Sequence, residues 1–393
     1  MKKKENVLRT KPKRLKIVIF SILLILGSFT LYGFLIGDAQ DSTVTIRQID
    51  EDGTLIKTPT TLVGRFLQKF SFDTTISGYS PVTHQELTMR YPRMNKKMTK
   101  VYRPKMTYQD IQKRLSDSKF LGSYYDVLSS QPVNGVQFDD TDTKYNRMRI
   151  ITSNDGKTWN KLNINYPNVP VRDDTLLWTG KKLFIYTTYG MFSTSNYKDW
   201  KGNVYRNEKL WDSFKSVWAP NVIDSASGKN YLVVTGNAKK QRTRKTYIAP
   251  INKSTGKISA VPTRLTIENG PTNVQSSYVS LVGQTYYLVL LTTKGHVELF
   301  KSNDLMGSFQ KDDEIKLTSK KWTYRSPQLL SVNGQKRLYY TLIRQRDGAS
   351  LGMRYRVINN HQIGQQKKVS NNFLTQNFNL RTNNEAKGMS HID

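Results

Sequence analysis

The chain has 393 residues, of which 37% are hydrophobic and 11% aromatic, and it contains no cysteine. The lack of cysteine excludes a disulfide framework, a thiolate metal site and a cysteine nucleophile. The formal net charge of +31 favours polyanionic partners: nucleic acid, anionic lipid headgroups or anionic polysaccharide.

Residues 1–16 form a basic tail with six lysines, two arginines and one glutamate, a net charge of +7, so that the rest of the chain carries +24. Residues 17–37 carry no charge and are rich in Ile, Leu and Phe. A helix of this length spans about 30 Å, the hydrocarbon thickness of a bilayer. The positive-inside rule then predicts a single-pass membrane anchor, with a cytoplasmic N-terminus and the bulk of the chain extracellular.

A cleaved signal peptide is the alternative for this segment. The apolar region of a signal peptide has about 7–15 residues and ends in a small-x-small site. The run at 17–37 is longer, and Gly37-Asp38-Ala39 matches such a site poorly. We therefore predict an uncleaved anchor in the cell membrane. Outside the membrane an anionic wall polymer is the most available polyanion, and no nucleic acid partner is expected.

Residues 38–118 show little periodicity and are predicted to form an extracytoplasmic stalk with some structure of its own. A run of basic residues without an intervening acid lies within it, comprising Arg90, Arg93, Lys96, Lys97, Lys100, Arg103 and Lys105. Such a run can lie on anionic headgroups or on another polyanion, or it can be a solvated face. Only residues 107–118, at the end of this region, have a helical pattern.

Residues 119–393 repeat a unit of two apolar runs joined by a turn that contains Gly. Four copies begin at Thr175, Asn221, Ser277 and Pro327. They read TLLWTGKKLFIYTT, NVIDSASGKNYLVVTG, SYVSLVGQTYYLVLLTT and PQLLSVNGQKRLYYTLIR. Each copy predicts a β-hairpin, because Gly readily adopts the positive φ that a tight turn requires.

A second repeated unit is a short strand followed by a polar turn and an aromatic residue. It ends at Trp159, Trp200 and Phe309, with intervals of 41 and 109 residues, which fit one blade and then two if the middle copy is lost. Four-stranded units at this spacing predict an all-β, five-bladed β-propeller over 119–393. An all-β sandwich is the alternative. The predicted blades begin near Lys119, Val171, Trp218, Ser277 and Arg325.

The turn SNDGKTW resembles the Asp-box of sialidase-type propellers, a motif that stabilises turns. The motifs at the blade starts are similar to those of the five-bladed glycosidases of glycoside hydrolase family 43, of the arabinosidase and xylosidase type. The resemblance covers residues 120–358. It rests on Arg172-Asp173-Asp174 for an RDP-type opening, Trp218-Ala219-Pro220-Asn221-Val222 for a WAP-type motif, Ser276 within an Ile-Asp-Pro-Ser-type position, and Arg325-Ser326-Pro327 for Glu-Gly-Pro.

The resemblance implies inverting hydrolysis by two carboxyl groups about 6.5–9.5 Å apart. Asp173 matches the catalytic base. The position of the general acid holds Arg325, and the position of the Asp that modulates the acid's pKa holds Ser276. Asn221 replaces the acid of the WAP-type motif, and Asp174 replaces a proline. Two of the three catalytic carboxylates are missing, which implies a degenerate catalytic centre.

Arginine cannot donate a proton at neutral pH, whereas its planar guanidinium binds anionic groups well. We therefore expect Asp173 as the one catalytic residue. Substrate binding is expected from Arg172, Asp174, Trp218, Asn221, Ser276 and Arg325. Two structural readings stay open: Asp173 as a turn cap paired with Arg172, and Trp218 as a core residue. Glu268 and Glu298 are the candidates for a relocated acid, although neither lies in a motif.

No cofactor and no metal are expected. The four histidines are scattered without metal-ligand spacing. The chain also lacks a phosphate-binding loop, a dinucleotide fingerprint and a Ser-centred nucleophile elbow.

Three functions remain open from the sequence. The first is a membrane-anchored, glycosidase-like propeller that binds a cell-surface glycan or an anionic wall polymer without the standard hydrolysis. The second is an active glycoside hydrolase that uses Asp173 as base with a relocated acid. The third is a structural component of a cell-envelope assembly. The missing carboxylates favour the first.

Overall fold

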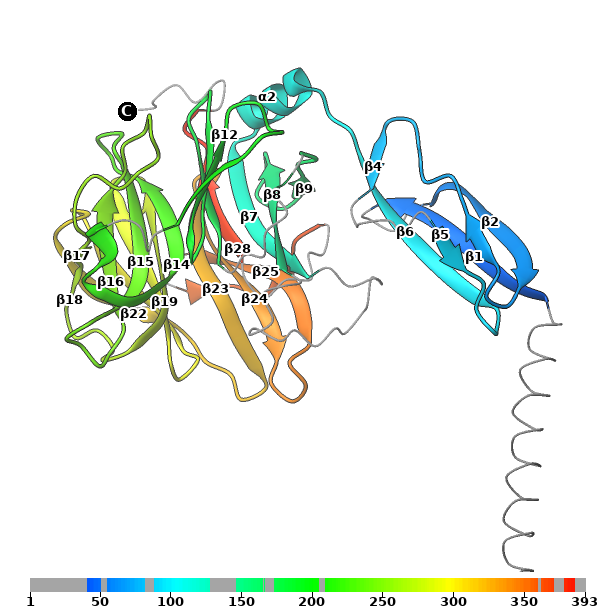
Figure 1. Cartoon of the computed structure of the whole chain (residues 1–393). Coiled ribbons are helices and arrows are strands. Elements are labelled where there is room, and N and C mark those ends of the chain that lie inside the picture. The colour runs from blue at the N-terminus through cyan, green and yellow to red at the C-terminus, as the bar shows by residue number, and fades with distance from the viewer. Residues whose placement is uncertain are drawn as a thin grey trace, which may run out of the picture. The chain divides into compact units, whose positions relative to one another are not determined.

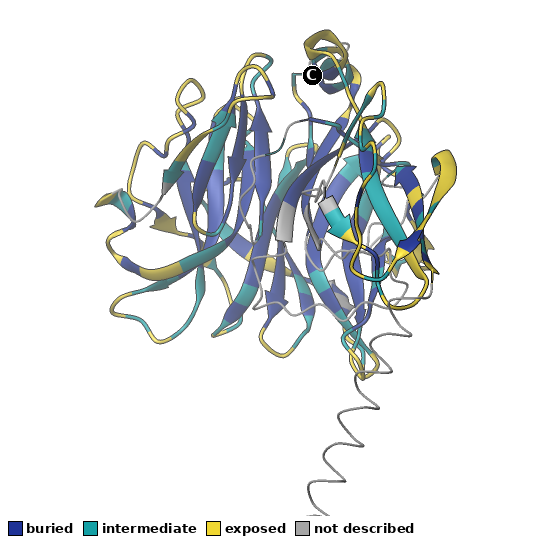
Figure 2. Cartoon of the chain, turned by 45° about the vertical axis from the view of Figure 1, so that its right-hand side comes forward, coloured by how far each residue is buried: buried dark blue, intermediate teal, exposed yellow. Residues whose placement is uncertain are grey.

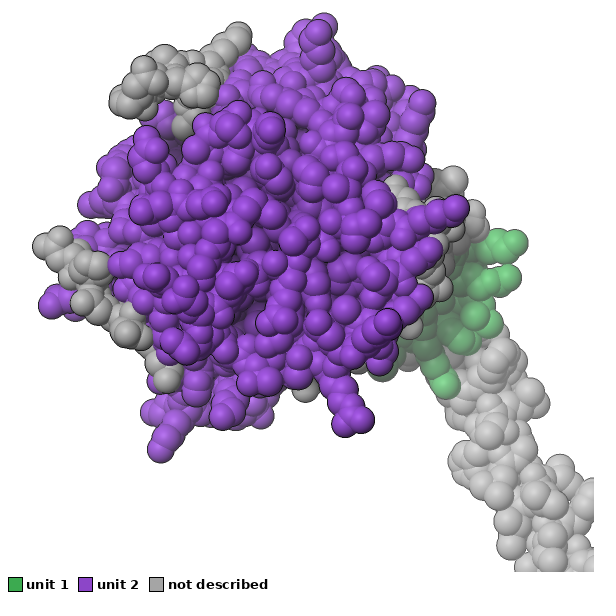
Figure 3. All heavy atoms as spheres, turned by 90° about the vertical axis from the view of Figure 1, so that its left-hand side faces the viewer, with its two compact units in different colours: residues 1–105 green, residues 106–393 purple. Residues whose placement is uncertain are grey.

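The computed structural model describes residues 41–50, 55–81, 88–127, 146–164, 166, 173–204, 209–359, 362–370 and 378–385. The chain divides into two compact units, one ending at Lys105 and one beginning at Met106 (Figure 3). The predicted tail and the anchor expected at 17–37 lie outside the described residues. Within the described ranges, no helix is both long enough and apolar enough to cross a bilayer.

The first unit is a small β domain where a stalk was expected (Figure 1). One sheet has the strand order β2-β1-β6-β4, and β3 pairs with β5 in a second sheet. β1 and β6 run parallel, and alternate residues of β1, such as Val44 and Ile46, are buried against Phe70 and Tyr91. The strands are β1 Asp41–Asp50, β2 Leu55–Arg65, β3 Lys69–Ser71, β4 Tyr79–Pro81, β5 Thr88–Arg90 and β6 Lys96–Pro104.

Helix α2, Tyr108–Asp117, falls within the predicted helical segment but belongs to the second unit. Thr107 caps its N-terminus: the hydroxyl accepts a hydrogen bond from the Asp110 N–H, and the Asp110 carboxylate accepts one from the Thr107 N–H. Ile111 and Leu115 are buried in a propeller core cluster. The compact units therefore divide after residue 105 rather than at the expected boundary after 118.

The second unit is a five-bladed β-propeller, as predicted. Its five blades are sheets with the orders β28-β7-β8-β9, β10-β11-β12-β13, β14-β15-β16-β17, β19-β20-β21-β22 and β23-β24-β25-β26, called here blades 1 to 5. β18 extends blade 4 beside β22, and β27 pairs with β25 in blade 5. Buried residues concentrate in the strands and exposed residues in the joining loops (Figure 2).

The elements of the second unit have the following bounds. They are β7 Phe120–Val127, β8 Asn146–Ser153, β9 Asn160–Lys161, β10 Thr175–Trp178, β11 Leu183–Tyr186, β12 Gly190–Thr194, β13 Lys201–Val204, η3 Lys209–Trp211, β14 Phe214–Asp224, β15 Asn230–Ala238, β16 Lys245–Pro250, β17 Thr263–Arg264, β18 Thr266–Ile267, β19 Val274–Val282, β20 Thr285–Thr292, β21 Val297–Ser302, β22 Ser308–Leu317, β23 Trp322–Val332, β24 Gln335–Arg344, β25 Ser350–Asn359, β26 Gln362–Ile363, β27 Lys367–Lys368 and β28 Phe378–Thr382.

Strand β28, near the C-terminus, closes the ring of blades. It forms the innermost strand of blade 1, beside β7 from the beginning of the unit. The side chain of Gln328 on β23 donates to the Phe378 carbonyl at 2.6 Å and accepts from the Leu380 N–H at 2.6 Å. Arg381 forms a partly buried ion pair with Asp224 of blade 3. Blade 1 is thus completed from both ends of the unit, which the sequence repeats did not predict.

All four predicted hairpins are present as the two inner strands of blades 2 to 5. The predicted polar turns join the third and fourth strands of blades 1, 2 and 4. In blade 3, where the motif was expected to be lost, a different sequence makes a similar turn. There the Asn252 carboxamide oxygen accepts from the N–H groups of Ser254 and Thr255, each at 3.1 Å.

Candidate functional site

The inner strands of blades 2 to 5 surround a pocket of about 310 Å³. Four of the predicted site residues line it: Asp173, Trp218, Ser276 and Arg325. Each comes from the beginning of a different blade. The ring of inner strands therefore brings together motifs that lie far apart in the sequence, and we call this space the axial pocket.

The backbone is strained where the blade motifs reach the axial pocket. Asp173, Ala219 and Ser326 have φ angles of 49°, 49° and 47°, in the left-handed region that residues with a side chain rarely adopt. Strand pairing shifts register between Trp218 and Asn221 and between Arg325 and Gln328. Such strain and such bulges concentrate at functional sites, where they redirect side chains.

Asp173 is the carboxylate of the axial pocket. The Thr188 hydroxyl, also in the pocket lining, donates to Asp173 Oδ2 at 3.4 Å. Burial raises the pKa of the neighbouring Tyr278 phenol, and the negative charge of Asp173 raises it further, against the opposing effects of Ser326, Ser276 and Arg325. Tyr278 therefore remains a protonated hydroxyl near neutral pH and can donate a hydrogen bond inside the pocket.

Trp218 and Arg244 form a stacked pair in the wall of the axial pocket. The indole Nε1 donates to the Gln275 carbonyl at 2.8 Å, which fixes the ring between blades 3 and 4. The Arg244 guanidinium carbon lies 5.1 Å from the centre of the ring, within the range of a cation–π contact. Trp218 is only partly buried, so it is not a simple core residue.

Arg244 was missed by the sequence reasoning. It belongs to the basic segment KKQRTRK at residues 239–245, between β15 and β16, and nothing in that segment resembles a blade-start motif. Its place near Trp218 depends on the pairing of β15 with β16 and on the Val274 N–H, which donates to the Arg244 carbonyl at 3.2 Å. The sequence did offer one signal for Arg244, which is a cationic residue close to the turn between two strands of a blade.

Asp174 is not among the lining residues of the axial pocket, although it follows Asp173 directly in the chain. It is 3% exposed, and burial raises the pKa of its carboxyl to about 8, with the Asp173 charge adding to the shift and the Ser123 hydroxyl opposing it. The group is therefore largely neutral at pH 7. Asp174 is buried and is not among the described lining residues, so its expected role in substrate binding stays a prediction.

Asn221 has a structural role in this geometry. Its side chain is 3% exposed, and its carboxamide oxygen accepts a hydrogen bond from the Val279 N–H at 2.8 Å. It therefore joins the inner strands of blades 3 and 4 and does not line the axial pocket. Arg172 lies outside the described residues, so its expected pairing with Asp173 stays a prediction.

The two glutamates proposed as relocated acids lie away from the axial pocket lining. Glu298 is on β21, the third strand of blade 4, and forms an ion pair with Lys311 at 3.7 Å. Glu268 accepts a hydrogen bond from the Ser308 hydroxyl at 2.7 Å. Among the residues that the structure describes in the lining, Asp173 is the one carboxylate and Arg244 and Arg325 are the cations.

This arrangement can bind an anion or a sugar but offers little acid–base chemistry. The described lining carries two fixed positive charges against one negative charge, together with hydroxyl groups and an indole face. Within the described ranges, no group of three or more His, Asp or Glu side chains could hold a metal ion. The axial pocket thus provides polar recognition groups around a single carboxylate.

No family model and no curated protein matches this chain. Solved structures that it resembles include a glycoside hydrolase family 43 enzyme (GH43_1) from Xanthomonas citri, with 11% identity over 63% of this chain and 92% of that chain and a TM-score of 0.44. Another is the α-L-arabinanase of Cellvibrio cellulosa, with 11% identity, 62% and 98% coverage and a TM-score of 0.42.

A third similar structure is the family 43 arabinoxylan arabinofuranohydrolase of Bacillus subtilis, solved with cellotetraose. It shows 12% identity over 69% of this chain and 69% of that chain, with a TM-score of 0.43. The family of these structures is the one that the blade-start motifs resemble. What this chain binds must be decided by the residues of its own axial pocket.

Proposed function

We propose that this protein is a membrane-anchored, extracytoplasmic propeller that binds an anionic glycan of the cell surface, such as a wall polymer, without hydrolysing it. One observation carries the proposal. In the described lining of the axial pocket a single carboxylate, Asp173, accompanies two arginines, Arg244 and Arg325, and an indole.

The missing second carboxylate argues against the standard hydrolysis. An inverting glycosidase needs one carboxylate to activate water and one carboxylic acid to protonate the leaving oxygen, about 6.5–9.5 Å apart. Asp173 could serve as the base, but the acid position holds Arg325, and a guanidinium group does not act as a general acid in proteins. Asp174 holds a proton near pH 7 but is not among the lining residues of the axial pocket. Among the described lining residues, no second carboxyl group is therefore placed to deliver a proton to a leaving group.

The same residues are well suited to binding. A guanidinium presents a planar set of donors that matches a carboxylate or phosphate with two parallel hydrogen bonds. Arg244 is held against Trp218, which limits its freedom before a ligand arrives. The exposed part of the indole offers an apolar face for a sugar ring, and Tyr278 and Thr188 add hydroxyl groups around Asp173.

The location is part of the proposal and rests on the sequence. The uncharged run at 17–37 follows a tail of charge +7, which favours an uncleaved anchor with the propeller outside the cytoplasm. Extraction of membranes at alkaline pH should leave the full chain in the membrane fraction and release a chain that begins at residue 38. Release of both chains would contradict the anchor.

The test of the binding proposal uses the full chain in neutral detergent, beside Asp173→Ala and the exposed control Asp212→Ala. Each is offered aryl-arabinosides, aryl-xylosides and purified wall polymers, and both product release and binding are measured. We expect no turnover from any of the three proteins and retained binding to an anionic polymer. Turnover that disappears only in Asp173→Ala would overturn the proposal and establish a hydrolase with a relocated acid.

A further inference from the structure

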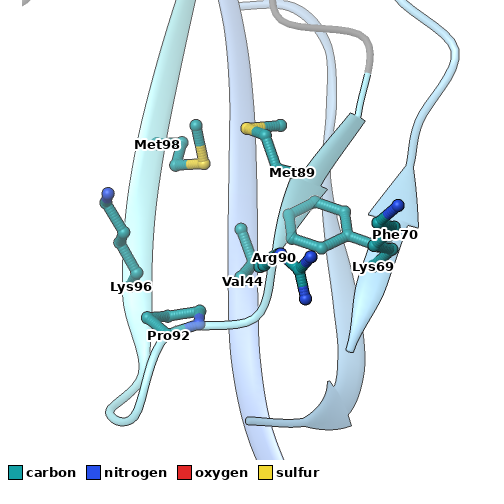
Figure 4. Close-up of a pocket in the computed structure, with 8 residues that line it drawn as sticks. All are labelled: Val44, Lys69, Phe70, Met89, Arg90, Pro92, Lys96 and Met98. Carbon is teal, nitrogen blue, oxygen red and sulfur yellow. The ribbon is translucent and has the colours of Figure 1, made fainter. Parts of the chain in front are cut away.

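The small β domain, residues 41–105, contains a second pocket, of about 410 Å³, which the proposed function leaves unused. Figure 4 shows Met98 of β6 on one side, Met89 and Phe70 of the β3–β5 pair on the other, and Val44 of β1 between them. Ligand pockets commonly have volumes of about 300–1,000 Å³ and apolar walls. Methionine side chains are flexible and adapt to irregular apolar ligands. We call this space the methionine pocket.

Basic side chains complete the methionine pocket. Lys69, Arg90 and Lys96 line it, and no acidic residue is among its described lining residues. Arg90 Nη1 donates to the Leu67 carbonyl at 3.0 Å, which holds the guanidinium close to the β3–β5 pair. An apolar floor beside three cations fits a ligand with both an apolar part and an anionic part.

Part of the basic run seen in the sequence therefore contributes to a pocket. Lys96 pairs with Val44 and Met98 pairs with Ile46 across the parallel strands β1 and β6. Since successive side chains of a strand point to opposite faces, Lys96 and Met98 share the pocket face and Lys97 points away from it. The run is thus divided between a pocket face and an outer face, rather than forming one uniform solvated surface.

The position of the methionine pocket on β1 indicates what fills it. Val44 is the fourth residue of β1, which begins at Asp41, four residues after the end of the expected anchor. A chain of four residues reaches at most roughly 14 Å. With residues 17–37 in the bilayer, the pocket end of β1 would lie close to the lipid headgroups. This step rests on the proposed anchor, whereas the composition of the pocket does not.

We infer that the methionine pocket binds an anionic lipid. The anionic headgroup lies at Arg90, with Lys69 and Lys96 on either side adding positive charge, and the adjoining part of an acyl chain lies against Met89 and Met98. Attraction of basic residues to an anionic bilayer surface does not by itself depend on which face of the domain carries the charge. Binding of a lipid in the methionine pocket, in contrast, depends on the lysines that line the pocket and on the acyl chain of the lipid.

The test compares two double variants of the full chain in neutral detergent. Lys69→Ala with Lys96→Ala removes two pocket lysines, and Lys57→Ala with Lys97→Ala removes two exposed lysines from strands of the same domain. Each protein is titrated with soluble dihexanoyl phosphatidylglycerol, and thermal unfolding confirms that it is folded. We expect at least tenfold weaker binding for the pocket variant and less than threefold for the control.

Two further arms identify the ligand chemistry. Glycerol 3-phosphate, which lacks acyl chains, and dihexanoyl phosphatidylcholine, which lacks net charge, should each bind at least tenfold more weakly than phosphatidylglycerol. Met89→Gln, which makes the floor polar at similar length, should weaken phosphatidylglycerol binding and leave glycerol 3-phosphate binding unchanged. Equal losses in the two double variants, or equal binding of all three ligands, would overturn the inference. A failed membrane-extraction test with successful lipid binding would reject the anchor alone.

Discussion

Two sets of repeated motifs in the propeller differ in how their polar groups are used. The turns between the third and fourth strands satisfy their polar groups locally: Asp155 Oδ1 accepts from the N–H groups of Lys157 and Thr158, and Ser153 Oγ accepts from the Gly156 N–H. The motifs at the blade starts place polar side chains in the axial pocket on a strained backbone instead. Repetition alone therefore does not separate structure from function in this chain.

The comparison gives a physical criterion. In the turn motif the aromatic residues Trp159 and Phe309 are fully buried and Trp200 is partly buried. The Trp159 ring meets Tyr339 of blade 5 edge-on at 6.4 Å. In the blade-start motif the aromatic residue Trp218 is only partly buried and packs against Arg244 in the pocket lining. A motif whose polar groups form hydrogen bonds within the motif stabilises the fold. A motif whose backbone is held in a strained conformation beside a pocket is available for ligand recognition.

Replacing Trp159 by Ala tests the turn side of this comparison with the largest expected effect. Trp159 packs with residues of blades 1 and 5, so its truncation opens a cavity between them. We expect a loss of about 3–5 kcal/mol in the free energy of unfolding, measured with urea. Glycan affinity should stay unchanged at temperatures where the variant is folded. A loss of affinity in the folded variant would show that the turn motif also serves binding.

Asp174→Asn tests how the buried carboxyl group of the blade-start motif affects the stability of the fold. The folded pKa of about 8 lies above the unfolded value of about 3.9, so between these values the folded state holds a proton that the unfolded state lacks. Raising the pH through this window therefore destabilises the wild type, and the slope ends above about pH 8. Because Asn does not titrate, the stability of Asp174→Asn relative to the wild type should increase by about 1–3 kcal/mol between pH 5 and pH 8.

The measurement is the thermal midpoint of both proteins at several pH values. Parallel pH profiles for wild type and Asp174→Asn would contradict the buried neutral carboxyl. Glycan binding should be retained in the variant, since Asp174 does not line the axial pocket.

Asp155→Asn should have the smallest effect and the opposite pH dependence. Burial raises the pKa of the Asp155 carboxyl, but hydrogen bonds from Thr158 and Lys157 outweigh this and hold the pKa below its ordinary value. The ionised group therefore stabilises the fold above about pH 4, and this contribution is lost as the pH falls through the lower folded pKa. We expect a loss of about 0.5–1 kcal/mol at pH 7 that shrinks toward pH 3, measured by urea unfolding. A loss that persists undiminished at pH 3 would argue against the charge as its cause.

The sequence predicted the parts of the fold that depend on local chemistry. Glycine turns defined the inner hairpins of blades 2 to 5, and the helical pattern at 107–118 located α2. Four of the seven predicted site residues line the axial pocket, because the blade-start motifs occupy equivalent positions on the inner strands. Each of these features can be identified from a short stretch of chain.

The features that were missed depend on long-range pairing. β28 completes blade 1 beside β7, although more than two hundred residues separate them in the chain. The parallel pairing of β1 with β6 turned an expected stalk into a folded domain, and Arg244 reaches the axial pocket only through the packing of blades 3 and 4. Asn221 was assigned to binding because it stands at the acid position of the WAP-type motif, whereas its carboxamide joins the inner strands of blades 3 and 4.

The most direct test of the central claim is calorimetric binding of a hexuronic acid oligosaccharide and its carboxyl-reduced, neutral counterpart to the full chain. Arg325→Met is compared with Arg346→Met, which removes an equal charge from a side chain 76% exposed. We expect the acidic ligand to bind at least tenfold more tightly than the neutral one. Arg325→Met should lose about 10–150-fold in affinity for the acidic ligand, as for a hydrogen bond to a charged group, and Arg346→Met almost none. Equal binding of both ligands, or cleavage of either by the wild type, would contradict a propeller kept for anionic glycan recognition.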